Sequence, residues 1–544
     1  MIGATAPGQR GPGAAPGIAI ALLVFVVAAW AILARDPSER VVAFTDDAYY
    51  YYGVAANVTA GRGFTFDGIH PTNGFQPLWL GMLLPLFAAV PGAEARLIGV
   101  LLLQAALLAA GAWLVWDLLR RRAGASAASL VVLAFFALPG SRGFWLGMES
   151  AIVLVTLAIA WRCWLRFEEC GREGSSGAHE RAGPAERGGA AWRFGLAAAF
   201  MSLARLEGAI GTLAVVGVAA VRARRRGEPW SLGTLMALLL PMGALVGAYI
   251  LWNQWLFGTP GPVSGQVKAY WVSRLTTAQR VRGLLDLQWP GRRIATLLSG
   301  LSMPEIPALI VPLLVLLTAI ALAWRRRDQV AGVVRATGIG FPLVACGAII
   351  LADHLVVGPY LGDWATVPAS LLTAIVIGVL GARAPAAPLL AAGLAVAFAA
   401  RIPLEIRSER RAQTRFNGQA YSIARVMRDR LPPDAVVHSP FSGVLAYYSG
   451  RRVVNLDGLV NSPEYLREVV RGGRWEALVR RERPDALVDV DCGPESPQVG
   501  LRGILDRLPR GAACLIPDER IPSVPMGDGC RITTWRIQPE ACEP

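Results

Sequence analysis

Long apolar segments, separated by short polar connections, dominate the first three quarters of this chain. Several of them are long enough for a helix that crosses a bilayer, and few charges interrupt them. The apolar windows fall at about 17–34, 97–118, 126–139, 149–165, 194–204, 208–221, 231–251, 304–324, 337–357, 367–381 and 386–403. This pattern predicts a polytopic α-helical membrane protein with about eleven transmembrane helices.

One further apolar segment, 78–90, is short for a span, and the basic clusters decide its interpretation. Arginine-rich clusters lie at 120–122, 222–226 and 325–327. If 78–90 crossed the membrane, the cluster at 120–122 would lie outside, against the positive-inside rule. If 78–90 is an interfacial helix, all three clusters lie inside. We therefore expect an interfacial helix and a cytoplasmic N-terminus, with the first apolar segment retained as a signal-anchor.

The windows 194–204 and 208–221 are separated by a short charged turn that contains Arg205 and Glu207. Both outer flanks are basic, so a hairpin of two short helices would place this turn on the external side. One long tilted helix is the alternative, and it would bury both charges in the membrane at considerable cost. The hairpin is the favoured interpretation.

The chain changes character after residue 404. Apolar windows shrink, and short β-like runs at 435–438, 452–456, 486–490 and 532–537 alternate with helical patterns at 417–430 and 463–481. This alternation predicts a transmembrane module over 1–404 and a small α/β domain over 405–544. With an odd number of spans the α/β domain is extracytoplasmic. Up to two disulfides are possible there, with pairing left open, among Cys492, Cys514, Cys530 and Cys542.

Composition supports the membrane assignment and argues against a nucleic-acid partner. Hydrophobic residues make up 54% of the 544 residues and charged residues only 17%, which excludes an ordinary soluble protein. The net charge of +14 lies in arginine clusters beside apolar windows. It therefore indicates cytoplasmic loop bias and not nucleic-acid binding. Lys268 is the only lysine in the sequence.

Most of the candidate chemistry lies in the first external loop, 36–96. Asp46 and Asp47 precede an aromatic run at 49–52 that includes Tyr50. Charges at a membrane surface beside aromatics are typical of a sugar site, where a partly desolvated carboxylate can act as a general base. The second carboxylate could tune the first or help to bind a divalent cation such as Mg²⁺, Mn²⁺ or Ca²⁺. The same residues are also a common helix start signal.

Several motifs carry a resemblance to a known family. The first loop reads DDAYYYYGVAANVTAGRGFTFDG…PTNGFQPLW, and Gly-Met-Glu at 147–149, Arg-Leu-Glu-Gly at 205–208 and Asn253…Pro-Val-Ser…Lys268 follow it. Together they resemble membrane glycosyltransferases of the GT-C superfamily, most closely the family-39-like bacterial branch that includes the mycobacterial arabinofuranosyltransferases. The tyrosine run is more aromatic than in the arabinofuranosyltransferase loops, so a pentofuranose donor is not implied.

The resemblance implies a function and a location. The chain would be a multi-pass enzyme of the bacterial plasma membrane that takes a sugar from a polyprenyl-phosphate carrier on the outer face. It would transfer this sugar, with inversion, to a hydroxyl of a glycan, lipid or protein. Asp46 or Asp47 would be the base. The sugar, the acceptor, the oligomeric state and the role of the C-terminal domain stay open.

The remaining candidate residues are interpreted as contacts to substrate. His70, Asn73 and Gln76 could bond sugar hydroxyls or phosphate oxygens, whereas Trp79 could stack on a sugar or belong to the interfacial aromatic belt. Glu149 opens an apolar window, so a second site carboxylate and a simple helix-end charge are equally compatible. Arg205 and Glu207 could pair internally, with Arg205 also a phosphate contact.

Lys268 could neutralise the charge of a lipid phosphate, or it could be an ordinary surface lysine. A transporter or flippase of lipid-linked sugars is the alternative function. It would be expected to show repeat symmetry and charges at mid-bilayer, and the sequence has neither pattern. A divergent homologue that has lost the site is a third possibility, against which the intact Asp46–Asp47 pair argues.

Overall fold

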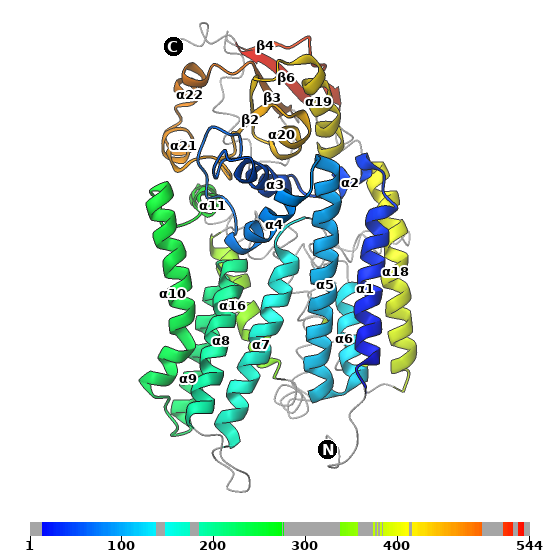
Figure 1. The fold of residues 1–544 in the computed structure, drawn as a ribbon, viewed down its shortest axis with the longest axis vertical. Helices are drawn as coiled ribbons and strands as arrows, with labels where there is room; N and C mark the ends of the chain where they lie inside the picture. The colour runs from blue at the N-terminus through cyan, green and yellow to red at the C-terminus, as the bar shows by residue number, and fades with distance from the viewer. Residues whose placement is uncertain are drawn as a thin grey trace.

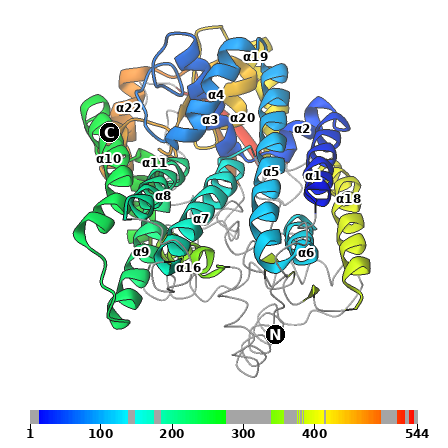
Figure 2. The same ribbon diagram turned by 60° about the horizontal axis from the view of Figure 1, so that its bottom comes forward.

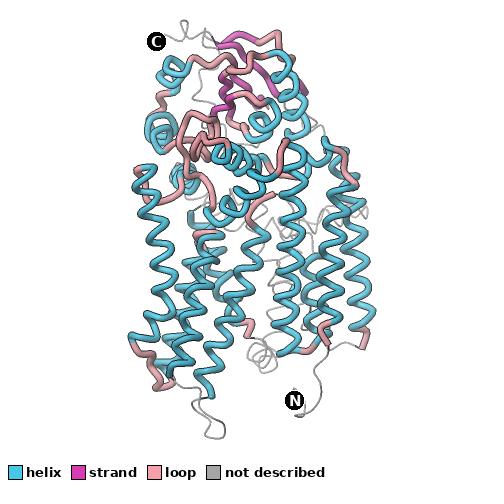
Figure 3. The backbone as a smooth tube through the Cα atoms, in the orientation of Figure 1, coloured by secondary structure: helices cyan, strands magenta, loops and turns pink. Residues whose placement is uncertain are grey.

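The structure is a computed structural model. It consists of a bundle of long helices with a small α/β region packed at one end (Figure 1). It describes residues 13–137, 147–173, 184–274, 276, 338–356, 385–412, 416–491, 515–525 and 531–537, together with residues 374, 375, 378, 381 and 382. Among the described residues, strands are found only at the end opposite to the long helices, and helices make up the rest of the bundle (Figure 3). The predicted fold class, an apolar helical protein with a C-terminal α/β region, is confirmed.

The apolar windows fold as helices. Their bounds are α1 Ala15–Leu33, α5 Ala93–Ala123, α6 Ala125–Ala137, α7 Ser150–Glu173, α8 Pro184–Ala204, α9 Gly208–Arg225, α10 Leu232–Phe257, α16 Gly340–Val356 and α18 Ala387–Ala412. Within the described residues, α1, α5, α7 and α10 are long and apolar enough to span a membrane. The window 304–324 and most of 367–381 lie outside the described residues. The number of spans therefore stays a prediction.

Local signals explain where individual helices begin and end. Ser231 accepts a hydrogen bond from the Thr234 N–H at the start of α10, and Gly258 ends that helix in the left-handed conformation at φ 69°. The hairpin prediction is confirmed, because α8 ends at Ala204 and α9 begins at Gly208. The charged turn between them lies at the end of the bundle that faces the α/β region.

Three short helices of the first loop lie between the bundle and the α/β region (Figure 1). They are α2 Pro37–Ala43, α3 Asp46–Thr59 and α4 Pro77–Ala89, and a further helix, α11 Val263–Ser273, lies beside them. The segment predicted as an interfacial helix corresponds to α4. One face of α4, including Trp79 and Phe87, is fully buried against the neighbouring helices.

The C-terminal region forms a mixed sheet in the order β2-β1-β3-β6-β4, with β5 beside β6. The strands are β1 Val436–Ser439, β2 Arg452–Asn455, β3 Ala486–Asp491, β4 Leu515–Pro517, β5 Val524–Pro525 and β6 Arg531–Ile537. The four predicted strands are confirmed, and they are β1, β2, β3 and β6. Sequence pattern missed β4 and β5, which are short and contain proline. The four cysteines of the predicted disulfides lie outside the described residues.

The helices of the C-terminal region are α19 Phe416–Arg430, α20 Gly443–Ser449, α21 Pro463–Tyr465, the π-helix η4 Leu466–Arg471 and α22 Trp475–Glu482. All of them except α19, which precedes β1, lie between parallel strands, since β1, β2 and β3 run in the same direction. The connection from β1 through α20 to β2 is a βαβ unit. In both ribbon views α20 lies next to α3 (Figures 1 and 2).

The first loop and the C-terminal region share one hydrophobic core. Tyr49 and Tyr52 of α3 are fully buried and pack edge-on or tilted against Tyr447 of α20. At Gly74 the loop backbone passes so close to Leu459 that a Cβ atom would overlap the Leu459 carbonyl oxygen. The predicted boundary at 404/405 falls inside α18. The C-terminal residues therefore pack as part of the same body as the first loop.

Candidate active site

Helix α3 presents the two aspartates and two tyrosines of the first loop toward different partners. Asp46 and Asp47 occupy its first turn, after Thr45 at the N-cap, whose side chain makes no capping bond. Tyr50 and Tyr51 lie one turn further along, so each stands beside one of the aspartates on the helix surface. The helix-start interpretation and the site interpretation are thus compatible.

Asp46 is bound by backbone groups of the C-terminal region. Its two carboxylate oxygens accept hydrogen bonds from the N–H groups of Gly443 at 3.0 Å and Val444 at 2.8 Å, at the start of α20. Burial raises the pKa of Asp46 to about 6, although these two donors act in the opposite direction. A Cβ atom at Gly443 would overlap the Asp46 carbonyl oxygen. Asp46 therefore joins α3 to α20.

The βαβ unit explains why the C-terminal region meets the loop here. Ser439 and Asn455 are paired at the carboxyl ends of the parallel strands β1 and β2. In open α/β sheets, functional groups gather where parallel strands end. The chain leaves β1 toward α20, which binds Asp46, and it leaves β2 toward Asp457. Both strand ends thus point at the first turns of α3.

Asp457 is a site residue that sequence analysis missed. Tyr50 donates a hydrogen bond to its Oδ2 at 2.8 Å, and the Leu459 N–H donates to its Oδ1 at 2.7 Å. Burial raises the pKa of Asp457 to about 7, and the nearby charge of Asp47 adds to this effect. Asn455 donates to the Tyr50 hydroxyl at 3.2 Å. The only signal in the sequence was Asn-Leu-Asp-Gly, which is also an ordinary strand-to-turn pattern.

Asp47 differs from both of these carboxylates. It accepts no hydrogen bond from the described residues, and its side chain is half-buried, so solvent reaches it. Burial raises the pKa of Asp47, and the positive charge of Lys268 on α11 acts in the opposite direction. The structure therefore brings Asp47 and Lys268 together from segments more than 200 residues apart.

A second cluster links α3 to the bundle. Glu149 is 2% exposed and accepts a hydrogen bond from the Tyr51 hydroxyl at 3.2 Å. Arg205 contacts Glu149 at 3.2 Å and Glu207 at 3.3 Å. The Gln76 N–H donates to the Tyr51 hydroxyl at 3.1 Å. Arg205 thus has the internal partners that a charge in this position requires, and it holds Glu149 below the first turns of α3.

The polar loop residues mostly bond to protein groups. The Asn73 side chain is fully buried, donates to the Asn253 amide oxygen and the Gly261 carbonyl oxygen, and accepts from the Val263 N–H at 2.9 Å. It thereby positions the start of α11, which carries Lys268. Trp79 is fully buried in the core, so its indole is not exposed to a membrane interface or to a sugar. The Gln76 amide oxygen is buried without a partner among the described residues.

His70 connects the loop to α22. Its Nδ1 lies 2.7 Å from Asp67 and its Nε2 lies 2.9 Å from Glu482, which also contacts His438 at 2.9 Å. Burial opposes charge on His70, but the hydrogen bonds to Asp67 and Glu482 raise its pKa to about 10. Burial opposes charge on Glu482 too, but the bonds to His438 and His70 lower its pKa to about 2. His70 therefore docks the loop onto the C-terminal region.

The His70 network predicts a pH-dependent stability. The His70 contribution is complete below its unfolded pKa of 6.5 and is lost as the pH rises through about 10, because the folded pKa is raised. The Glu482 contribution is complete above 4.5 and is lost as the pH falls through about 2. In thermal unfolding, we expect the difference between wild type and His70→Gln to be largest between pH 4.5 and 6.5 and to shrink toward pH 10. A difference that is constant with pH would contradict this assignment.

A cation at Asp46 and Asp47 stays a prediction. The described residues contain no group of three or more His, Cys, Asp or Glu side chains arranged to hold a metal ion. Both oxygens of Asp46 already accept backbone hydrogen bonds, which leaves Asp47 with the more accessible carboxylate. Loss of activity in a chelator, restored by Mg²⁺, Mn²⁺ or Ca²⁺, is the measurement that would reveal a bound cation.

Comparison with known proteins gives limited matches. A family model described as a domain of unknown function (DUF8728) matches residues 405–522. No curated protein matches the sequence. The structure is similar to the crystal structure of ArnT from Cupriavidus metallidurans bound to undecaprenyl phosphate, with a TM-score of 0.49, 13% identity and coverage of 97% of this chain and 98% of that one. The apo state of ArnT matches over the same shares with a TM-score of 0.43 and 15% identity.

Proposed function

We propose that this chain is an integral membrane glycosyltransferase that transfers a sugar from a polyprenyl-phosphate carrier to a hydroxyl acceptor. The observation that carries the proposal is the position of Lys268 near Asp47, where its positive charge acts on the Asp47 carboxylate, at the end of an apolar helical bundle. Asp47 is a half-buried carboxylate with no hydrogen-bond donor among the described residues. Transfer from a phosphate leaving group requires a base for the acceptor hydroxyl and a cation for the departing phosphate.

In the proposed step, Asp47 acts on the acceptor hydroxyl and Lys268 acts on the leaving phosphate, on opposite faces of the anomeric carbon. The acceptor hydroxyl loses its proton to Asp47 while its oxygen forms a bond to the anomeric carbon. The bond from that carbon to the phosphate oxygen breaks, and the electron pair leaves with the polyprenyl phosphate. Lys268 stabilises the charge on this phosphate. Attack from the face opposite to the leaving group inverts the anomeric configuration.

Neighbouring residues position the base. Asp46 holds the first turn of α3 against α20, and Tyr50 ties the same helix to Asp457. Burial raises the pKa of Asp47, although the positive charge of Lys268 acts in the opposite direction, and a raised proton affinity suits a general base near neutral pH. The Glu149–Arg205 pair supports the opposite side of α3 through Tyr51.

The arrangement of basic clusters supports a sidedness for the reaction. The clusters at 120–122 and 222–226 lie at the end of the bundle opposite to Asp47. By the positive-inside rule, this supports a site and a C-terminal region on the extracytoplasmic face and an N-terminus in the cytoplasm. The proposed compartment is the bacterial plasma membrane, and the proposed acceptor is a glycan, lipid or protein hydroxyl.

Reconstitution tests the function directly. Wild-type protein in proteoliposomes would be given a panel of radiolabelled polyprenyl-phosphate sugars, hexosyl and pentosyl, with extracted envelope glycans and lipids as acceptors. We expect one donor class to be consumed, with release of polyprenyl phosphate. Movement of labelled lipid-linked sugar across the bilayer without any release would instead support the flippase.

Lys268 supplies a separate prediction about the leaving group. Lys268→Gln removes the cation that faces Asp47, so we expect kcat to fall about 100-fold, as when one charge-stabilising group is removed from a transition state. Lys268→Arg keeps the charge and is expected to recover part of the rate. Arg274→Gln removes a positive charge from the last turn of the same helix region, where Arg274 stacks on Tyr270, and serves as the control. Equal effects at both positions would argue against a phosphate role.

A further inference from the structure

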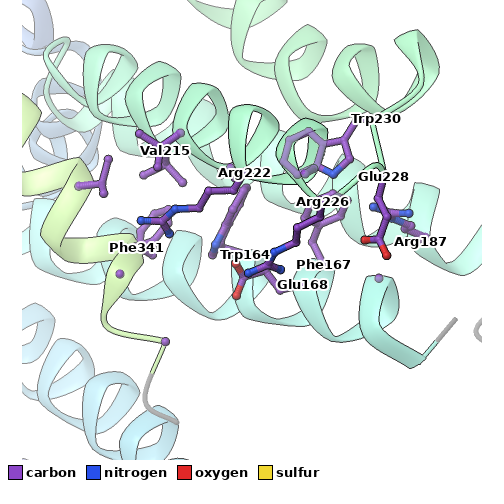
Figure 4. A pocket seen from close by; sticks show the side chains of 17 residues that line it. Trp164, Phe167, Glu168, Arg187, Val215, Arg222, Arg226, Glu228, Trp230 and Phe341 are labelled. Atoms are coloured by element: carbon purple, nitrogen blue, oxygen red, sulfur yellow. The ribbon is translucent and has the colours of Figure 1, made fainter. Parts of the chain in front are cut away.

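A cavity lies at the end of the bundle opposite to the carboxylate site. Its volume is about 240 Å³, and it is enclosed by the far ends of α7 and α9, the start of α8, the start of α16 and the segment before α10 (Figure 4). Nothing in the proposed transfer reaction uses this region. Its lining includes aromatic rings and guanidinium groups, together with aliphatic side chains and two carboxylates.

The aromatic rings form a contiguous wall. Trp164 packs against Phe167 at 5.6 Å and against Phe341 at 6.2 Å between ring centroids, and Phe167 packs edge-on against Trp230 at 5.4 Å. These contacts join α7, α16 and the segment before α10. Because the rings hold one another in place, the cavity is a built feature and not a gap between mobile side chains.

Three guanidinium groups lie along this wall (Figure 4). Arg222 and Arg226 are four residues apart on the last turn of α9 and its C-cap, so they share one face of the helix. Neither forms an ion pair with a carboxylate in the described part of the chain. Arg187 lies over the Phe167 ring at 5.4 Å, and its Nε is buried without a hydrogen-bond partner among the described residues.

Other arginines at the same end of the molecule have carboxylate partners. Asp117 contacts Arg120 at 2.8 Å, Arg121 at 3.0 Å and Arg162 at 3.2 Å. Arg166 contacts Glu186 at 2.8 Å. The cavity arginines have no such carboxylate partner among the described residues, so their charge is available to a ligand. The cavity also contains Glu168 and Glu228, which leaves its lining with one net positive charge.

The cavity borders the apolar outer surface of the bundle. Val218 lines the cavity and is also 37% exposed, and Val221, one turn further along α9, is 53% exposed. An occupant can therefore place an anionic group among the arginines while apolar chains follow the outside of α9. Basic pockets between membrane helices on the cytoplasmic side suit acidic lipid headgroups.

We propose that this cavity binds the phosphate of an anionic phospholipid of the surrounding membrane. Arg222 and Arg226 contact the phosphodiester oxygens, Arg187 supplies the buried donor, and Trp230 lies beside the glycerol region. Arginine suits this role because its planar fork of N–H groups matches phosphate geometry. The inference concerns a lipid that anchors the cytoplasmic ends of α7, α8, α9 and α16, and it does not depend on the transfer reaction.

Lipid retention by the full-length protein tests the proposal. The protein would be reconstituted in nanodiscs of phosphatidylcholine with a minor fraction of phosphatidylglycerol, and retained lipid would be counted by native mass spectrometry. Wild type should retain phosphatidylglycerol in preference to phosphatidylcholine. The double variant Arg222→Gln/Arg226→Gln should lower that retention about tenfold. Arg222→Lys/Arg226→Lys keeps the charge and should give an intermediate value.

A control double variant at the same end of α9 distinguishes a specific lipid site from a general effect of surface charge. Arg224→Gln/Arg225→Gln removes the same charge from residues that do not line the cavity, and retention should stay within about twofold of wild type. Equal losses for the two pairs, or a wild type without preference for phosphatidylglycerol, would overturn the proposal. Displacement of the lipid by inorganic phosphate at millimolar concentration would also overturn it, because the site would then belong to a free anion.

Discussion

Asp47→Asn is expected to lower sugar transfer about 10³-fold while leaving folding and donor binding close to wild type. Asn has the same shape as Asp but cannot take the acceptor proton, so the loss should appear in kcat. The Asp47 carboxylate makes no hydrogen bond with the described residues, so the fold should lose little when it becomes an amide. Single-turnover transfer and a donor-binding assay would separate the two effects.

Asp46→Asn is the matched comparison, because the two residues are adjacent and differ only in their partners. An amide in place of the Asp46 carboxylate can accept from only one of the Gly443 and Val444 N–H groups. The other donor would be left facing an NH₂ group at a cost of about 1–3 kcal/mol. We therefore expect Asp46→Asn to lower the melting temperature as well as the rate. If instead Asp46→Asn abolished transfer without loss of stability and Asp47→Asn were active, the assignment of the base would be reversed.

Gly443→Ala is expected to weaken the junction between α3 and α20. The added methyl group would overlap the Asp46 carbonyl oxygen, and it would crowd the Asp46 carboxylate as well. Because the neighbour is backbone, relief requires a shift of a whole helix, and overpacking of this kind costs about 1–3 kcal/mol. The displaced α3 would also carry Asp47 away from Lys268, so transfer should fall together with stability.

Thermal unfolding and limited proteolysis of the C-terminal region would measure this effect. Gly81→Ala on α4 is the control, since a Cβ atom there meets nothing within 4 Å and helix propensity favours alanine. The two variants make the same chemical change in the first loop and its partner region. A Gly443→Ala protein as stable as Gly81→Ala would show that the close approach of α3 and α20 does not support the site.

The sequence predicted the parts of this protein that depend on local order. Apolar windows became helices wherever the structure describes them, because a run of apolar residues long enough to span a bilayer has little alternative. The turn at Arg205 and Glu207 was predictable from the cost of burying two charges. The strands β1, β2, β3 and β6 were predictable from β-branched runs, whereas β4 and β5 were too short to carry a pattern.

The candidate site was predicted in its composition and not in its assembly. Asp46, Asp47 and Lys268 were selected from the sequence as candidate site residues. The sequence could not predict that their environments differ. His70 and Asn73 were expected to contact a substrate, and Trp79 to stack on a sugar or to belong to the aromatic belt. The structure instead gives them protein partners or a place in the core. A polar or aromatic residue in a loop looks the same in sequence whether its partner is a sugar or another segment of the chain.

By itself, the sequence determined the membrane-protein class, the helical windows, the C-terminal α/β pattern and the importance of the first loop. These features follow from the length of each apolar segment and from the spacing of apolar residues along it, and both depend only on residues close together in the sequence. Only the tertiary structure decided that α20 binds Asp46, that Asp457 joins the site, and that Asp47 is the carboxylate left to face Lys268. Those contacts link residues more than 200 positions apart, and they depend on backbone groups and burial that no local pattern encodes.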